Sequence, residues 1–173
     1  SWYLDIVCEQ WDALVLNDYE AVMPLPKRKK WGLKYIYQPF MCQQLGVFHK
    51  QESYCVDDFI SAIPKEILHF NFNLNTHNSS TICVLKSNVN YLLPLDKNIE
   101  ELRANYSKSH LKNLRRANKN NLSIATVPDS AEQFSKNKRL LASGFMNAKQ
   151  FDLELNIINT SLELGKGEIF SVK

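Results

Sequence analysis

Two short apolar runs near the start of the chain are separated by a polar turn. Trp11–Leu16 and Tyr19–Leu25 flank Asn17-Asp18, two residues that tolerate positive φ in a tight turn. This pattern predicts a β-hairpin. Because proline donates no ladder hydrogen bond, we expect Pro24 and Pro26 to end the pairing.

The next segments are expected to be a connection, a strand and a short helix. "KRKKWG", residues 27–32, is predicted as an exposed connection, and "LKYIYQPF" as a third strand that ends at Pro39. A helix is predicted over Val56–Ala62. Pro64 closes it because proline cannot continue a helix.

A strict alternation of apolar and polar residues marks "ILHFNFNLN", residues 67–75. It predicts a half-buried strand with one apolar and one polar face. The polar face has two interpretations, a solvated edge or the lining of a cleft, and consists of His69, Asn71, Asn73 and Asn75. After a turn at "THNSS", we expect "TICVLKSNVNYLLPL" to supply one or two further strands that pair back as a meander.

Helical spacing dominates the second half of the chain. A long helix is predicted from an N-cap at Asp96, with Glu100 and Glu101 favourably placed in its first turns. Its apolar stripe steps by five residues from Tyr106 to Leu111, so "SKS" at 107–109 indicates a kink or a new helix start. The stripe comprises Ile99, Leu102, Tyr106, Leu111, Leu114 and Ala117.

A strand, two helices and a last strand complete the predicted order. "LSIATVPD" and "EIFSVK" are the strands, and the helices are expected over 130–142 and 151–164, the latter closed by Gly165. This order predicts a single α+β domain over residues 1–173, with α/β layers. Its sheet should be mixed, largely antiparallel, flanked by helices and incomplete at the C-terminal edge.

The composition is that of a globular protein, with 45% apolar and 23% charged residues. No stretch approaches the ~20 apolar residues needed to cross a bilayer, and the first ten residues lack the features of a signal peptide. We therefore expect a cytoplasmic protein. The chain begins without Met, which favours a fragment of a longer protein.

The four cysteines, Cys8, Cys42, Cys55 and Cys83, lie far apart in the sequence. Without an export signal we expect them to be reduced and mostly buried. Cys42, His49 and Cys55 are spaced seven and six apart, unlike the short pairs that bind zinc, so no metal site is predicted.

The net charge of +3 is unevenly distributed. Residues 27–34 carry five cations and no acid, and residues 97–121 carry seven cations and two acids, so each segment is +5. The rest of the chain therefore carries 3 − 10 = −7. Two basic patches on an acidic body indicate local electrostatics rather than a general affinity for polyanions.

The basic part of the long helix has several interpretations. Lys108, Lys112, Arg115 and Lys119 share one helical face, with Arg116 at its border. A solvated face, a site for an anionic substrate, an RNA-binding surface and a surface that packs on another part of the protein all remain open. The absence of interleaved acids favours an anion site, because a solvating face normally mixes signs.

Two regions resemble a known group of enzymes. "WDALVLNDYEAVMPLPKRKKWGLKYIYQPF" with "QQLGVF" resembles the opening of bacterial proteins of the GNAT acyltransferase superfamily. "YSKSHLKNLRRANKNNL" resembles a helix of the related Fem-type (FemAB-like) aminoacyltransferases. The likeness covers roughly residues 10–125, and the order of the segments matches as well.

The resemblance implies a GNAT-like fold that occurs in two copies, with this chain as the N-terminal, acceptor-binding copy. The donor would be acyl-CoA or aminoacyl-tRNA, so tRNA is an implied partner, as is the C-terminal half of the parent protein. The acceptor would be an anionic small molecule or a peptide. No catalytic residue is assigned, and the chain by itself is not expected to be active.

One motif departs from the family pattern. GNAT enzymes hold the pyrophosphate of CoA on a Gln/Arg-x-x-Gly-x-Gly/Ala turn that opens a helix. Gln43 and Gly46 match and are the candidate cofactor-binding residues, but Phe48 occupies the last small position. The alternative is a buried turn with Gly46 at positive φ.

Overall fold

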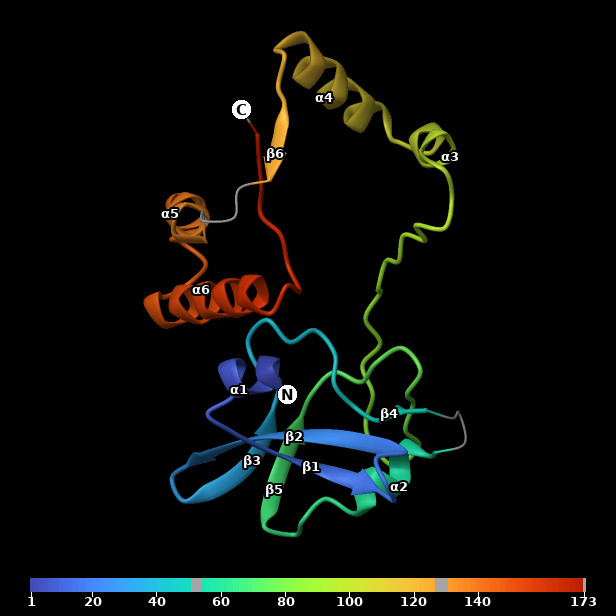
Figure 1. The fold of residues 1–173 in the computed structure, drawn as a ribbon. Helices are drawn as coiled ribbons and strands as arrows, with labels where there is room; N and C mark the ends of the chain where they lie inside the picture. Colours follow the sequence, from blue (N-terminus) through green and yellow to red (C-terminus); the bar gives the residue numbers. More distant parts are fainter. Residues whose placement is uncertain (51–53, 127–130, 173) are drawn as a thin grey trace.

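The computed structural model describes residues 1–50, 54–126 and 131–172 and has the predicted α+β architecture (Figure 1). In chain order the elements are α1 (Trp2–Val7), β1 (Gln10–Leu16), β2 (Ala21–Lys30), β3 (Leu33–Tyr37), β4 (Phe48–His49), α2 (Val56–Ser61), β5 (Ile67–Asn71), α3 (Ile99–Ala104), α4 (Lys108–Lys119), β6 (Ile124–Thr126), α5 (Ala131–Ala142), α6 (Ala148–Glu163) and β7 (Phe170–Val172).

The main sheet has five strands and is mixed, as predicted. Its order is β1-β2-β3-β5, with β1, β2 and β3 antiparallel and β5 parallel to β3, while the short β4 pairs with the start of β2. The predicted hairpin is confirmed, with a four-residue turn between Leu16 and Ala21. The third strand is confirmed as well.

The prediction that prolines end the hairpin is wrong. Pro24 lies opposite Ala13 and Pro26 opposite Trp11, and β2 continues to Lys30. Between residues 23 and 26, β2 pairs only with β1, because β4 and β3 pair with its two ends. The proline nitrogens are tolerated there because an unpaired edge needs no donor.

"KRKKWG" is likewise not a connection. Residues 27–30 belong to β2, and the chain reverses at Trp31-Gly32, both of which have positive φ (50° and 84°). Two successive residues with positive φ make the tight turn whose twist matches a β-hairpin. The turn therefore joins β2 directly to β3.

The core lies between the sheet and α2. Met23 and Ile36 of the sheet are fully buried and belong to one cluster with Val56, Phe59 and Ile60 of α2. The predicted helix at 56–62 is confirmed. The apolar face predicted for residues 67–75 was Leu68, Phe70, Phe72 and Leu74, and it contributes only in part, because Leu68 is 67% exposed. The partly buried residues of β5 and of the segment after it that pack on this cluster are Ile67, Phe70, Phe72 and Leu74.

The predicted meander over residues 81–95 is wrong. This segment contains no regular strand, and most of its large apolar side chains are exposed, including Val84, Tyr91 and Leu93. A strand needs a partner to satisfy its main-chain groups, and the apolar residues of this segment do not by themselves provide one. The N-cap of the next helix is Asn98 rather than Asp96, and its side chain accepts a hydrogen bond from the Glu101 N–H.

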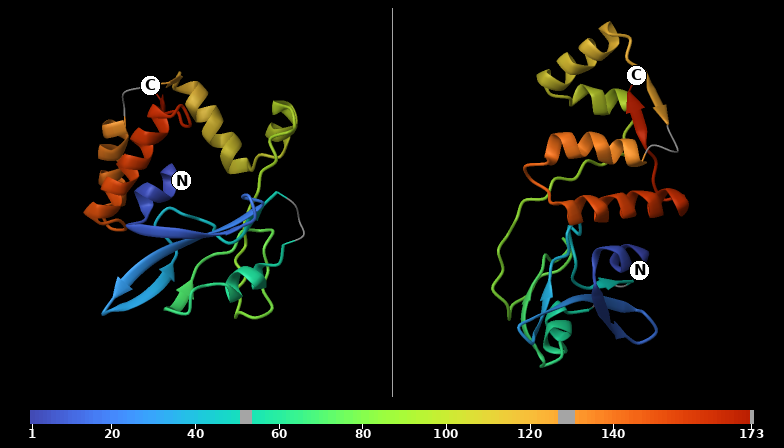
Figure 2. Two further views of the ribbon diagram at one scale, coloured as in Figure 1. Left: turned by 60° about the horizontal axis from the view of Figure 1, so that its bottom comes forward. Right: turned by 90° about the vertical axis from the view of Figure 1, so that its left-hand side faces the viewer.

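The predicted break at 107–109 is confirmed, because α3 ends at Ala104 and α4 begins after Ser107. In all three views α3 and α4 lie apart from the main sheet (Figures 1 and 2). The total exposed surface of 13205 Å² exceeds the roughly 8,700 Å² expected for a compact monomer of 20.0 kDa. The second half of the chain is therefore extended rather than folded onto the sheet.

The last elements form a helical pair and a separate two-stranded sheet. α6 begins at Ala148, three residues before the predicted start, because Asn147 and Gln150 form a capping box. Its end at Gly165, with a φ of 61°, is as predicted. β6 and β7 pair antiparallel with each other and not with the main sheet, and α6 reaches the main body through Ile157, which packs on α1.

Candidate functional site

The five predicted anion-binding side chains all lie on α4. Ser107 caps this helix by accepting a hydrogen bond from the His110 N–H at 3.2 Å. All five side chains are exposed, and none forms an ion pair with a carboxylate of the described residues. Their charge is therefore available to a ligand, and their role stays a prediction. They are Lys108, Lys112, Arg115, Arg116 and Lys119.

The opposite side of α4 carries the predicted apolar stripe, which covers no core. No residue of α3 or α4 is buried, and Leu114 is 42% exposed. Neither helix makes an extensive contact with another described element. The interpretation of α4 as a packing surface requires an uncovered apolar stripe of this kind, so it remains open beside the interpretation as an anion site.

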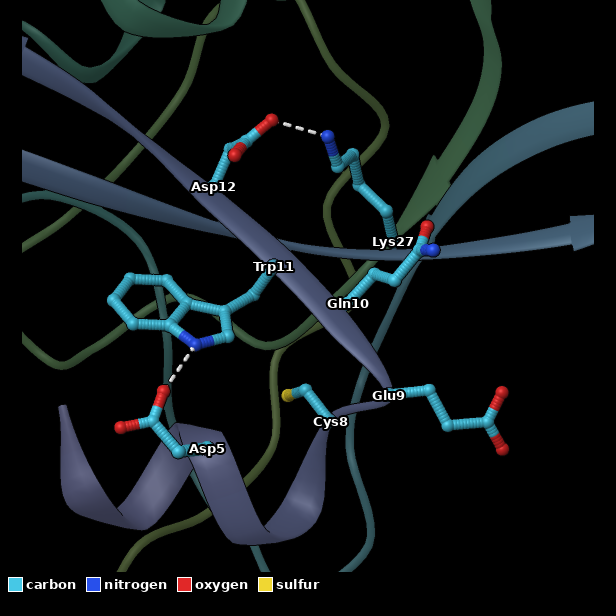
Figure 3. Close-up of a pocket in the computed structure, with 7 residues that line it drawn as sticks. All are labelled: Asp5, Cys8, Glu9, Gln10, Trp11, Asp12 and Lys27. Atoms are coloured by element: carbon cyan, nitrogen blue, oxygen red, sulfur yellow. Dashed lines mark hydrogen bonds and ion pairs between the residues drawn. The ribbon is translucent and has the colours of Figure 1, made fainter.

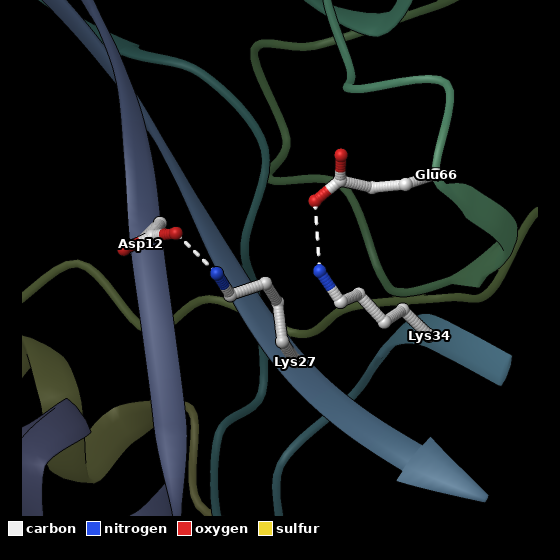
Figure 4. Close-up of polar contacts among 4 residues, drawn as sticks. All are labelled: Asp12, Lys27, Lys34 and Glu66. Atoms are coloured by element: carbon white, nitrogen blue, oxygen red, sulfur yellow. Dashed lines mark hydrogen bonds and ion pairs between the residues drawn. The ribbon is translucent and has the colours of Figure 1, made fainter. Parts of the chain in front are cut away.

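The basic segment at 27–34 is partly neutralised by local contacts. Lys27 contacts the carboxylate of Asp12, and the ammonium of Lys34 lies 2.9 Å from Glu66 (Figure 4). In addition, the Arg28 guanidinium stacks 4.1 Å from the centre of the Tyr37 ring. This patch is therefore built into the sheet, in contrast to α4.

The candidate cofactor turn at Gln43–Phe48 lacks the features that hold a pyrophosphate. The N–H of Leu45 donates to the Asn73 carbonyl at 2.7 Å, and the N–H of Val47 donates to Asn78 Oδ1 at 2.6 Å. Phe48 then begins a strand rather than a helix. Anion loops of this type depend on free amides at a helix start, so the geometry does not favour donor binding at Gln43 and Gly46.

Gly46 instead forms the buried turn with positive φ that the sequence predicted as the alternative. Its φ is 91°, and a Cβ there would overlap the side chain of Asn78. Asn75 is buried beside it, and its Nδ2 donates to the Val47 carbonyl at 2.9 Å. The carboxamides of Asn75 and Asn78 thus fix the turn by hydrogen-bonding the main chain of Val47.

A groove of about 910 Å³ follows the end of β5. One wall is the polar and apolar run from His69 to Asn78, and the other is the segment Cys83–Asn90. Gln43 closes one part of it and lies 3.5 Å from Asn90 Oδ1 through its Nε2. The four predicted polar residues, His69, Asn71, Asn73 and Asn75, all line this groove, and the first three are also exposed to solvent, so both interpretations of this face still apply.

A smaller cavity of about 410 Å³ lies between α1 and β1 (Figure 3). Trp11 Nε1 donates to Asp5 Oδ1 at 2.8 Å, and Cys8 points into the same space. Burial raises the pKa of the Cys8 thiol to about 11. A thiol that stays protonated at neutral pH is a poor nucleophile, so this cavity carries no cysteine chemistry.

The cysteines are all free, as expected, but they are less buried than predicted. Cys8 is buried, Cys42 and Cys83 are half-buried, and Cys55 is exposed just before α2. Among the described residues no three His, Cys, Asp or Glu side chains cluster closely enough to hold a metal ion. No helix within the same ranges is long and apolar enough to cross a bilayer.

No protein-family model, curated protein or solved structure matches the chain. The resemblance to GNAT and Fem-type enzymes therefore stays a prediction from the residues. Sequence reasoning missed the Cys83–Asn90 wall of the groove because it assigned that segment to paired strands. The polar run of Lys, Ser and Asn between apolar residues was the feature that argued against a strand there.

Proposed function

We propose that this chain is the N-terminal, acceptor-binding part of an N-acyltransferase of the GNAT and Fem type. The observation that carries the proposal is the order of two segments, residues 10–48 and 106–122, which resemble that group. They fold as a hairpin with a third strand and as a capped basic helix. A mixed sheet in an α+β fold is consistent with this assignment.

The proposed reaction is the transfer of an acyl group from an activated donor to an amine. The acceptor amine attacks the acyl carbon of a thioester or ester, the C–S or C–O bond breaks, and the amine proton leaves with the thiol or hydroxyl. Because the donor is already activated, alignment of the two reactants supplies much of the rate. The cations of α4 would hold an anionic group of the acceptor, and arginine suits phosphate or carboxylate because its planar fork donates two hydrogen bonds.

The test is transfer of a labelled acetyl group from acetyl-CoA, and of an amino acid from aminoacyl-tRNA, to a peptide amine by the full-length natural protein. Arg115→Ala and Arg116→Ala should each raise the KM for the acceptor by about tenfold, with little change in kcat. Lys136→Ala, an exposed cation on α5, is the matched control. Unchanged KM values would remove α4 from the site, and the absence of any transfer would refute the proposal.

A second candidate function is RNA binding by α4 without chemistry. One observation favours it: α4 lines neither of the two cavities described, and a polyanion needs no cavity. Affinity for single-stranded RNA should then fall with salt, with a log–log slope of about −0.7 per phosphate neutralised. The double variant Lys112→Gln, Arg115→Gln should flatten this slope, whereas Lys136→Gln, Lys166→Gln should not. A flat response of the unmodified protein excludes this function.

A further inference from the structure

β5 is the last strand of the main sheet, and one of its edges is free. It pairs with β3 on one side and, over the residues that the structure describes, with no strand on the other. Just after β5, the carbonyl of Asn73 accepts a hydrogen bond from the Leu45 N–H, and the N–H of Asn75 donates to the Leu45 carbonyl. The main-chain groups of Asn73 and Asn75 therefore face the side on which β3 lies. Because main-chain groups alternate along a strand, those of Phe70 and Phe72 point to the free side.

The groove described above runs along this free edge. Residues 69–76 form one wall, in which 69–71 belong to β5 and 72–76 continue beyond its end. The facing segment 83–90 exposes three apolar side chains, Val84, Leu85 and Val89. An edge strand and an apolar wall therefore border the same elongated space.

The polar lining of the groove carries little charge and is rich in amides. Six Asn and two Gln make eight carboxamides, while Lys86 is the only Lys or Arg and no Asp or Glu contributes. Carboxamides donate and accept at once, as peptide groups do, so they complement main-chain amides. The lining is unsuited to a multiply charged ligand, because such a ligand would lose its hydration without gaining opposite charges.

We propose that this groove binds an extended peptide, which adds as a strand to the free edge of β5. The main chain of Phe70 and Phe72 would hydrogen-bond the peptide, and Val84 and Val89 would contact its side chains on one face. Strand addition of this kind takes its affinity from the main chain and its specificity from alternate side chains. The peptide would be neutral or carry one carboxylate, to which the ammonium of Lys86 would donate.

This inference does not depend on the proposed acyl transfer. It needs only the free edge, the facing wall and the amide-rich lining, and it involves no chemistry and no residue of α4. A protein without acyltransferase activity would still bind the peptide, so the two proposals fail separately.

The experiment uses the full chain labelled with ¹⁵N and the peptide acetyl-Thr-Val-Thr-Val-Thr-Glu-amide. Binding is followed by the amide shifts of Phe70 and Phe72 and by their hydrogen exchange. The main control is the same peptide methylated at alternate main-chain nitrogens, which keeps the side chains and removes donors. The double variant Val84→Asp, Val89→Asp changes the groove wall. Leu93→Asp is the matched control, because Leu93 lies in the same irregular stretch, residues 81–95, but does not line the groove.

We expect the peptide to shift both amides and to slow their exchange at least tenfold, and the methylated peptide to bind at least tenfold more weakly. The double variant should weaken binding by a similar factor and Leu93→Asp should not. Equal binding of both peptides, or no binding at 1 mM, would overturn the proposal. So would strong protection of Phe70 and Phe72 in the free protein, because segment 83–90 would then occupy the edge itself.

Discussion

The side chain of Asn78 fills the space that a side chain on Gly46 would need, and its Oδ1 accepts the Val47 N–H at 2.6 Å. The backbone of Gly46 has a φ of 91°, so an alanine there meets two costs, an unfavourable backbone conformation and the displacement of Asn78. Gly46→Ala should therefore lower the free energy of unfolding by about 3 kcal/mol, as measured by urea titration.

Gly32 is the matched control for this substitution. Its φ of 84° is similar, but within the described part of the chain no heavy atom outside its sequence neighbours lies within 4 Å of an added Cβ. Gly32→Ala should cost only about 1 kcal/mol, which is the conformational part. Equal losses for Gly46→Ala and Gly32→Ala would show that Asn78 does not fix the turn.

Asp57 of α2 hydrogen-bonds Thr81, which lies just before the groove wall formed by residues 83–90. Its carboxylate accepts hydrogen bonds from the Thr81 N–H at 3.0 Å and from the Thr81 hydroxyl at 2.6 Å. Hydrogen bonds from Ser80 and then Thr81 lower the pKa of Asp57 below its ordinary value of 3.8. The folded state thus favours the carboxylate, so this stabilisation is complete above pH 3.8 and is lost as the pH falls through the lowered pKa.

Asp57→Asn should therefore reproduce at neutral pH part of what acid does to the unmodified protein. We expect faster hydrogen exchange at Thr81 and a smaller loss of stability between pH 5 and pH 2 than in the unmodified protein. Asp58→Asn, an exposed neighbour in the same helical turn, should leave the hydrogen exchange at Thr81 unchanged. Identical acid titrations of the Asp57→Asn and unmodified proteins would contradict this account.

The elements with a local cause could be predicted from the sequence. The first hairpin, the strand at Ile67–Asn71 and the break before Lys108 follow from turn residues, alternation and an interrupted helical stripe. A buried turn with Gly46 at positive φ was the alternative to a cofactor turn because Phe48 occupies the last small position of that motif. Each of these features depends on residues within about one turn or one strand of each other.

The features that failed depend on distant neighbours. Whether Pro24 ends a strand is decided by which edge of β2 is free, and that depends on where β3 and β4 pair. Segment 81–95 is rich in apolar residues and was predicted as paired strands, but its part 83–90 faces the β5 side of the groove without pairing, so the groove between them could not be expected. The sequence identified the polar face of the groove but not its second wall.

Glu154 is a buried carboxylate that joins the helical pair. It is 3% exposed in α6 and contacts the ammonium of Lys138 in α5, and its Oε2 has no hydrogen-bond partner among the residues that the structure describes. Removal of one member of a buried pair leaves the other without compensation, whereas exposed pairs contribute little. Glu154→Ala should cost about 2 kcal/mol, because Lys138 is itself partly exposed.

Asp152→Ala provides the comparison, because Asp152 pairs with Arg139 between the same two helices at 2.8 Å but in solvent. This variant should cost less than about 1 kcal/mol. Chemical denaturation of both variants, monitored by helical circular dichroism, measures the difference. Similar losses for the two would mean that burial of Glu154 does not determine the strength of its pair.

The four thiols should react with Ellman's reagent at very different rates at pH 8. Cys55 is exposed and should react first, whereas Cys8 is buried and its pKa is raised to about 11 by that burial. At pH 8 almost all of Cys8 is therefore the unreactive thiol, and its reaction should be slower by at least a hundredfold. Cys55→Ser should abolish the fast phase and leave the others unchanged, and in 6 M guanidinium all remaining thiols should react alike. A fast phase that survives in Cys55→Ser but disappears in Cys8→Ser would show that the cavity between α1 and β1 activates its thiol instead of protecting it.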